Sequence, residues 1–259
     1  MQRYCHETCK TELMMKRILI FLAVLATLAA LAYGGLVWFL TRPAPPLEKG
    51  PVISLLQGEI QSGIDRDNPD ILQLNGIPFA APPVGDLRWA APQPPLDWEG
   101  VRDGTEFGAQ CYQNRSGSGE FLRDLLDGMG LNAVERHLAT IVIENAPAPI
   151  ESEDCLFLNV RTGNLNSETL QPVMVWIHGG SHQSGAGSMD LYQANGLVEK
   201  GVVLVTINYR LGPFGYMAHP ALSADDPRGV SGNYGLLDQV AALEWVRDNI
   251  AALGAIRAM

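Results

Sequence analysis

Gly179, Gly180 and Ser181 could bind an anion, and they follow a short apolar run at Val173–Ile177 and one histidine, His178. Paired glycines let a backbone approach a ligand closely and aim its N–H groups at one point. Such N–H groups can stabilise the oxyanion of an acyl-transfer reaction. The residues alone leave a second interpretation open, a tight strand-to-loop turn without chemistry.

The apolar run before the glycines has the length and composition of a buried parallel strand that ends at the carboxyl edge of a sheet. Ligands bind at that edge in open α/β sheets. Residues 154–160 and 202–208 are also predicted strands, and 233–250 a helix. Strands that alternate with helices predict a parallel sheet. The face of the helix expected to be buried carries Leu236, Val240, Leu243 and Val246, widened by Trp245 and Ile250.

Two further elements are predicted upstream. Residues 52–64 and 70–79 are strand-like and flank the turn-forming segment 65–69, which predicts an antiparallel hairpin. Residues 120–139 are helix-like, with glycines at 128 and 130 where the helix can split. One side of that helix is expected to carry Leu122, Leu125 and Leu126.

The N-terminal region contains 23 uncharged residues at Ile18–Leu40. At helical rise they span about 34 Å, which is enough to cross a bilayer. Lys16 and Arg17 precede them, so we expect residues 1–17 to be cytoplasmic, 18–40 to be a signal anchor and 41–50 a Pro-rich linker. A signal peptide cleaved at the small residues 28–32 is the alternative, and Met15 is an alternative start.

The composition indicates which classes of binding partner the chain can have. A hydrophobic content of 47% supports a sizeable core, and a net charge of −10 argues against a nucleic-acid partner. Cys5 and Cys9, with His6 between them, are too few ligands for a metal site, so we expect no metal or cofactor. Cys111 and Cys155 are expected to pair in an exported protein, two free thiols being the alternative.

Several motifs together carry a resemblance to a known family. They are Asn75-Gly76-Ile77-Pro78-Phe79-Ala80, Leu87-Arg88-Trp89, Glu153-Asp154-Cys155-Leu156-Phe157-Leu158-Asn159-Val160, the glycine motif, Asn208-Tyr209-Arg210 and Gly232-Asn233-Tyr234-Gly235-Leu236-Leu237-Asp238-Gln239. In order and spacing the chain resembles the type-B carboxylesterases, the carboxylesterase/cholinesterase family, over residues 51–253. The resemblance implies an α/β-hydrolase fold and serine esterase chemistry on a small-molecule carboxylic ester.

The resemblance also implies roles for individual residues. The oxyanion hole would comprise Gly179, Gly180 and Ser181, with the N–H groups of the last two as donors, and His178 would be structural. It further implies a Cys111–Cys155 disulfide near the active-site gorge and a structural ion pair between Arg88 and Glu153. The chain departs from the family pattern at Ser181, His182 and Arg161.

No serine lies in a Gly-x-Ser-x-Gly nucleophile elbow, and Ser231 comes nearest. We therefore expect this chain to hold the first half of a family domain and to be an inactive, membrane-anchored fragment with its hydrolase part outside the cytoplasm. The alternatives are a non-catalytic adhesion or binding ectodomain and a non-functional fragment. Residues 254–259 depart from the family's Gly-Asp-Pro-x-Asn-Val, and one single-base deletion would produce them with a stop, so we expect a frameshift there.

Overall fold

The computed structural model describes residues 2–42, 44–114, 118–145, 148–163, 165, 170–193 and 195–256, without the side chains of 2–13 and 118–122. The last three residues of the expected aberrant tail and the Leu122 side chain lie outside this description. The chain forms two compact units, residues 1–44 with 117–148 and residues 45–116 with 149–259.

The described residues of the first unit form three helices. Helix α1 (Gln2–Thr41) contains the stretch Met14–Thr41, whose 28 residues and mean hydropathy of 2.3 suffice to cross a membrane. The helix expected around 120–139 is split at its glycines into α2 (Ser118–Gly128) and α3 (Ala133–Asn145). Leu126 is buried, whereas Leu125 is partly exposed.

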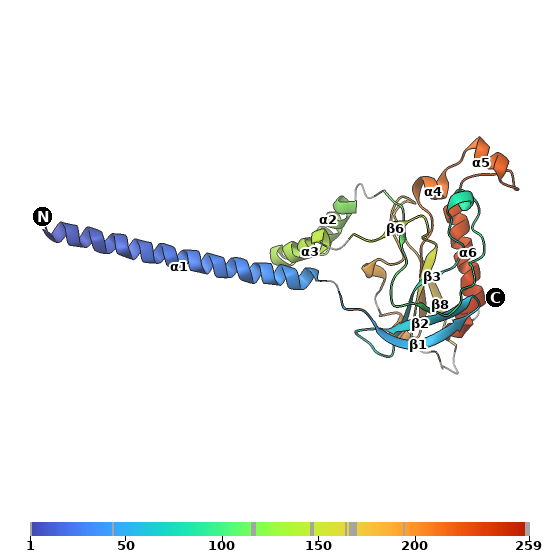
Figure 1. Ribbon diagram of the computed structural model, residues 1–259, viewed down its shortest axis with the longest axis horizontal. Coiled ribbons are helices and arrows are strands. Elements are labelled where there is room, and N and C mark those ends of the chain that lie inside the picture. The colour runs from blue at the N-terminus through green and yellow to red at the C-terminus, as the bar shows by residue number, and fades with distance from the viewer. Residues whose placement is uncertain are drawn as a thin grey trace. The chain divides into compact units, whose positions relative to one another are not determined.

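The second unit is built on a seven-stranded sheet with the strand order β1-β2-β3-β7-β9-β8, and β4 pairs with β2 (Figure 1). The strands are β1 (Glu48–Leu55), β2 (Gly58–Ile64), β3 (Leu72–Pro78), β4 (Val101–Asp103), β7 (Phe157–Thr162), β8 (Val173–Ile177) and β9 (Val203–Ile207). A small parallel pair is formed by β5 (Gln110–Cys111) and β6 (Glu151–Ser152). Helices α4 (Gly212–Tyr216), α5 (Pro220–Asp225) and α6 (Tyr234–Asn249) follow β9, and the 3₁₀ turns are η1 (Gly85–Leu87), η2 (Asp190–Tyr192), η3 (Val198–Lys200) and η4 (Ile250–Leu253).

The expectation of a parallel sheet is wrong for most of these strands. Only the β8–β9 and β2–β4 pairs are parallel in the large sheet, and the others are antiparallel. The β1–β2 and β2–β3 pairs are joined by short turns, which only antiparallel neighbours allow, whereas β3–β7 and β7–β9 are antiparallel across long connections. The run 52–64 likewise contains the second half of one strand and all of the next, with a turn at Leu56–Gln57, and the expected hairpin across 65–69 is the β2–β3 pair.

The prediction that Val173–Ile177 is buried is also wrong. β8 pairs in parallel with β9 as expected, but it is the last strand of the described sheet, and Met174, Trp176 and Ile177 are each about 40% exposed. Just before β8, Gln171 forms an isolated parallel bridge with Ala255, and its carbonyl accepts a hydrogen bond from the Ile256 N–H. An apolar run therefore predicted the strand but not its burial.

Helix α6 turns a different face to the sheet than its apolar residues predict. Leu236, Val240 and Leu243 are exposed, and Val246, Trp245 and Ile250 are buried. The full set of buried residues in α6 is Tyr234, Gly235, Asp238, Ala242, Trp245, Val246 and Asn249. Asp238 lies on this inner face and pairs there with a buried arginine, described below, so a charged residue is part of the face that packs on the sheet.

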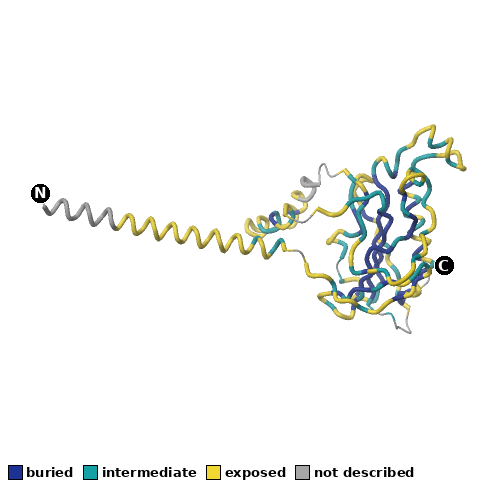
Figure 2. Tube along the Cα trace, in the orientation of Figure 1, coloured by how far each residue is buried: buried dark blue, intermediate teal, exposed yellow. Residues whose placement is uncertain are grey.

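The core of the second unit runs along the middle strands and under α6, where burial is densest (Figure 2). Ile60, Leu74, Ile77, Leu158 and Val205 have no exposed surface. These residues come from four adjacent strands. This core includes residues of β9, the strand that pairs with β8. The glycine motif begins at the carboxyl end of β8, beside this packed strand.

Candidate functional site

The glycine loop, His178–Gly187, leaves β8 through a run of left-handed backbone. Gly180, Ser181 and His182 have φ values of 112°, 53° and 60°. A Cβ at Gly180 would overlap the Ser184 carbonyl, so only glycine fits there. Ser181 and His182 are less suited to this region, and such strain is typical of functional sites.

The loop presents unused hydrogen-bond donors. Gly179, Gly180 and Ser181 are exposed, and no described residue accepts a hydrogen bond from their N–H groups. The carbonyl of Gly180 is occupied, since it accepts from the N–H groups of Gln183 (2.9 Å) and Ser184 (3.2 Å). The Gly180 carbonyl thus closes the turn, while the N–H groups of Gly179, Gly180 and Ser181 have no acceptor among the described residues, an arrangement suited to binding an anionic oxygen.

His178 is buried beneath the loop and faces away from solvent. Its Nδ1–H donates to the Gly179 carbonyl at 2.9 Å, and its ring stacks on Tyr209 at 4.4 Å. The Tyr209 hydroxyl donates back to the His178 carbonyl at 2.8 Å. Burial lowers the pKa of His178 below 6.5, although the Gly179 hydrogen bond opposes this. A neutral, packed imidazole of this kind supports the loop.

The loop is tied to helix α4 by its second histidine. The His182 ring stacks on Tyr216 with centroids 4.4 Å apart and an interplanar angle of 3°, and its carbonyl accepts from the Gly212 N–H at 2.7 Å. Burial raises the pKa of Tyr216 to about 12, so the phenol stays protonated. His182 is therefore an exposed residue of the loop whose ring packs on the Tyr216 ring.

The far end of the loop is held by two amide side chains. Asn208, just after β9, accepts from the Gly187 N–H at 2.8 Å and donates to the carbonyls of Ala109 and Cys155, both at 3.1 Å. Gln113 accepts from the Gly185 N–H at 2.8 Å. Sequence reasoning did not single out Gln113, because one glutamine in an irregular segment gives no signal.

Cys111 and Cys155 form a disulfide, which joins β5 to the segment just before β7. Beside it, Arg88 makes a two-point ion pair with Glu153, with Nε–Oε2 at 2.5 Å and Nη2–Oε1 at 2.6 Å. This pair is partly exposed, so it contributes little stability by itself. Its geometry ties residues 80–95, which contain five prolines, to the segment between β6 and β7 that carries the second cysteine.

A buried ion pair joins the end of β9 to helix α6. The guanidinium of Arg210 donates to both carboxylate oxygens of Asp238, at 2.8 and 2.7 Å, and its backbone N–H donates to the same carboxylate at 3.0 Å. The guanidinium also donates to the Ala90 carbonyl at 2.9 Å. Both charged side chains are buried. The family motifs contain both residues, but nothing in the sequence paired them.

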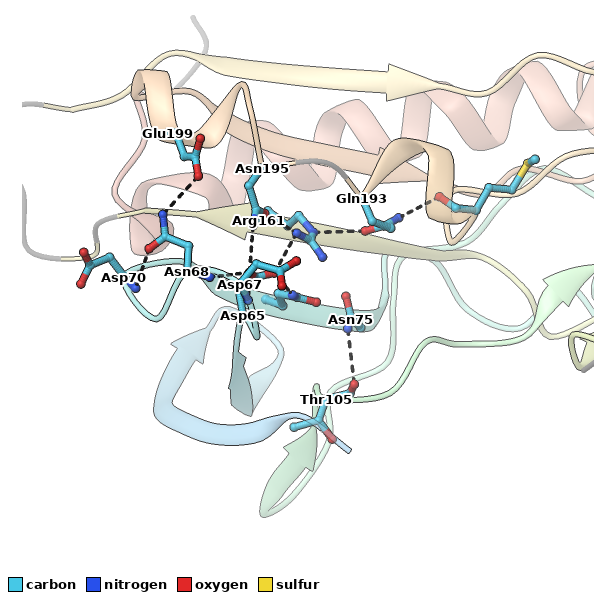
Figure 3. Close-up of polar contacts among 12 residues, drawn as sticks. Asp65, Asp67, Asn68, Asp70, Asn75, Thr105, Arg161, Gln193, Asn195 and Glu199 are labelled. Atoms are coloured by element: carbon cyan, nitrogen blue, oxygen red, sulfur yellow. Dashed lines mark hydrogen bonds and ion pairs between the residues drawn. The ribbon is translucent and has the colours of Figure 1, made fainter. Parts of the chain in front are cut away.

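A second buried network surrounds Arg161, the residue that departs from the family pattern (Figure 3). Its Nη1 lies 3.1 Å from the Asp65 carboxylate, and it donates to Gln193 and Asn195. Gln193 in turn donates to the Gly187 carbonyl at 2.9 Å. The network thus links the 65–70 turn, through β7, to the end of the glycine loop. An arginine within an apolar strand signals a buried carboxylate partner, although not which one.

Two cavities bounded by described residues have no residue of the glycine loop in their lining. A cavity of about 10 Å³ adjoins the disulfide, which is room for about one water molecule. A groove of about 270 Å³ lies between residues 92–95 and α6, and its lining includes Pro92, Pro94, Trp245 and Asn249. Within the described part of the chain, no three His, Cys, Asp or Glu side chains gather in a way that could hold a metal.

Comparison with known proteins assigns the family. The model of the carboxylesterase family matches residues 49–256, and the chain belongs to that family. It is 44% identical to the fumonisin B1 esterase of Sphingopyxis macrogoltabida over 195 residues, which cover 75% of this chain and 32% of that protein. It is also 44% identical to the para-nitrobenzyl esterase of Bacillus subtilis over 180 residues, covering 69% and 31%.

The fold agrees with this assignment. A solved para-nitrobenzyl esterase superposes with a TM-score of 0.60 at 36% identity, covering 79% of this chain and 35% of that chain. Its relatives have the α/β-hydrolase fold, as the family resemblance implied. The chain spans about a third of the length of the curated relatives it matches.

Proposed function

We propose that this chain carries the oxyanion-binding part of a membrane-anchored serine carboxylesterase that acts on a small-molecule carboxylic ester. The observation that carries the proposal is the pair of exposed, unpartnered N–H groups at Gly180 and Ser181, held at the carboxyl end of β8. Membership of the carboxylesterase family supports the reaction class.

In the proposed reaction a serine hydroxyl attacks the ester carbonyl and a histidine accepts its proton. The carbonyl oxygen gains negative charge, and the N–H groups of Gly180 and Ser181 stabilise it, with a third donor from the residue after the nucleophile. His178 is not the base, because its ring is buried and its Nδ1–H is engaged by Gly179. Its contribution is to hold the loop in the donor conformation.

The 259 residues contain no Gly-x-Ser-x-Gly elbow, so a serine acyl-enzyme cannot form in the expected way. We propose that the chain alone does not turn over esters, and that the glycine loop functions when the elbow and the other triad members are supplied. Hydrolysis of p-nitrophenyl butyrate by the purified 259-residue chain tests the first statement. A rate above that of buffer would contradict it.

A chimera tests the second statement. Residues 49–256 replace the corresponding part of the Bacillus subtilis para-nitrobenzyl esterase, to which the chain is 44% identical. We expect the chimera to hydrolyse p-nitrophenyl esters. Because Ser181 has a φ of 53°, Ser181→Gly should retain the rate, and Ser181→Val should lower kcat by up to about 100-fold with little change in KM.

The chimera also separates the esterase from the binding-module alternative. A chimera that folds, as judged by circular dichroism and cooperative melting, but hydrolyses nothing would contradict the oxyanion role. That result would favour a non-catalytic adhesion or binding ectodomain instead. Equal rates for Ser181→Val and Ser181→Gly would show that this backbone position does not hold the transition state.

We further propose that α1 anchors the protein in a membrane with the second unit outside the cytoplasm. Its apolar stretch is long enough, and Lys16 and Arg17 precede it. A cleaved signal sequence has the same features, so the test is extraction of membranes with alkaline carbonate. We expect the protein to stay in the pellet. A soluble form that begins near Tyr33 would show cleavage.

A further inference from the structure

The α2–α3 hairpin belongs to the same compact unit as α1, and its helix α3 packs on the C-terminal part of α1 (Figure 1). The hydroxyl of Tyr33 in α1 shares a hydrogen bond with Nε2 of His137 in α3 at 3.0 Å. The two rings also stack, with centroids 6.1 Å apart and an interplanar angle of 15°. The hairpin therefore has a fixed level along the apolar helix.

That level can be placed relative to a bilayer. The last charge before the apolar run is Arg17, and a hydrocarbon core of about 30 Å takes about 20 helical residues. A span that starts at Ile18 reaches the far boundary near Val37. Tyr33 lies about 6 Å before that point. Any segment that packs on Tyr33 is then at the depth of the far leaflet or its headgroups.

Aromatic side chains mark the same level. Tyr33, Trp38 and Phe39 are all exposed on α1, and such residues gather where the hydrocarbon meets the headgroups. His137 contacts the first of these residues. The hairpin thus adjoins the interfacial part of the helix.

The hairpin exposes apolar side chains at its turn. Met129 is 61% exposed and Val134 is 67% exposed, while Leu126 and Ile141 are buried inside the unit. Two more apolar residues, Leu125 and Val142, are partly exposed. An ion pair between Arg136 and Asp127, at 2.6 Å, braces the two helices beside this turn. An amphipathic element with exposed apolar residues at interfacial depth is suited to lie in a membrane surface.

We propose that the α2–α3 hairpin is a second membrane contact, with Met129 and Val134 inserted among the headgroups of the far leaflet. This rests on the proposal that α1 spans the membrane. Between Ser118 and Asn145 the chain has five carboxylates and two arginines. We therefore expect the hairpin to contact a zwitterionic lipid surface, because anionic headgroups would repel its net negative charge.

Depth-dependent quenching in the full chain tests the proposal. Cys5 and Cys9 are changed to serine, the disulfide is left intact, and single cysteines are introduced as Met129→Cys, Val134→Cys, Asp124→Cys or Leu28→Cys. Each is labelled with an NBD fluorophore, and the chain is reconstituted in phosphatidylcholine vesicles. Lipids with a spin label near the headgroup or deep in the acyl chain serve as quenchers. Asp124 is the matched control because it is an exposed, charged residue of the same hairpin.

We expect probes at 129 and 134 to shift to the blue and to lose more than about half of their emission to the shallow quencher, as for a side chain about 5–10 Å into the interface. The probe at 124 should keep its emission, and the probe at 28 should respond to the deep quencher. Quenching at 28 without quenching at 129 and 134 overturns the hairpin contact and leaves the anchor standing. Quenching at none of these positions overturns both.

Discussion

The side-chain oxygen of Asn208 accepts a hydrogen bond from the backbone N–H of Gly187 at 2.8 Å. The nitrogen of the same amide donates to the carbonyls of Ala109 and Cys155. One buried side chain thus joins the end of the glycine loop to the disulfide-bonded segment. The conformation that exposes the N–H donors of the loop depends on this amide as well as on the glycines.

Asn208→Leu should destabilise the second unit by about 3 kcal/mol, because one buried N–H and two carbonyls lose their partner. Urea denaturation followed by tryptophan fluorescence measures the change, since four of the five tryptophans lie in this unit. The exposed amide Gln93 gives a matched control, and Gln93→Leu should change stability by less than about 0.5 kcal/mol. Equal effects of the two substitutions would contradict the role assigned to Asn208.

Acid should weaken the network around Asp65. Burial raises the pKa of this carboxyl, but hydrogen bonds from Asn195, Asn68 and Asp67 and the charge of Arg161 outweigh burial and hold it below 3.8. A folded-state pKa below the unfolded value gives stability that is present above about pH 4 and is lost as pH falls through the folded-state value. Asp65→Asn should therefore show a flatter loss of stability below pH 4 than the parent chain. Parallel pH profiles of unfolding free energy would contradict this.

Removing only one partner of the Asp65–Arg161 pair should be costly. Arg161→Met leaves a buried carboxylate without its cation, and we expect a loss of about 3–5 kcal/mol. The double variant Asp65→Asn/Arg161→Met should lose less than the sum of the single changes, because it leaves no buried charge. A double-mutant cycle from urea denaturation measures this coupling, and additive losses would show that the pair does not interact.

The Cys111–Cys155 bridge should form in any folded sample, and peptide mass mapping under non-reducing conditions detects it. The bridge closes a loop between residues 44 apart, so chain entropy predicts a stabilisation of about 4 kcal/mol. Cys111→Ser/Cys155→Ser should therefore unfold at lower urea. Two free thiols in the mapped, folded protein would contradict the pairing.

The family, the α/β-hydrolase fold and the disulfide could be predicted because they depend on short motifs whose order survives in the sequence. The glycine motif likewise located the loop whose N–H groups are free. The direction of strand pairing could not be predicted from apolar runs, because β7 has the same composition whether its neighbours are parallel or antiparallel.

The buried polar networks were missed for a related reason. Asp65 lies in a turn and Arg161 in a strand, 96 residues apart, and only the fold brings the two together. Asp238 reads as a solvent-facing residue of an amphipathic helix until Arg210 is placed opposite it. Burial is predicted from the spacing of apolar residues along the sequence. A buried charge pair places charged residues at positions where that spacing predicts apolar ones or solvent exposure, so it is missed.

Helix α6 offers the sharpest test of which face packs on the sheet. Trp245 is 3% exposed and Leu243, two residues away, is 45% exposed, although the apolar pattern predicts both to be buried. Trp245→Ala should cost about 3–5 kcal/mol, because it leaves a large cavity beneath the helix. Leu243→Ala is the matched control in this 259-residue chain, and as a surface change it should cost about 0.5 kcal/mol or less. A cost of 2 kcal/mol or more for Leu243→Ala, in the range of core leucines, would mean that the helix is rotated towards its leucine face, and the buried Arg210–Asp238 pair could not then form as described.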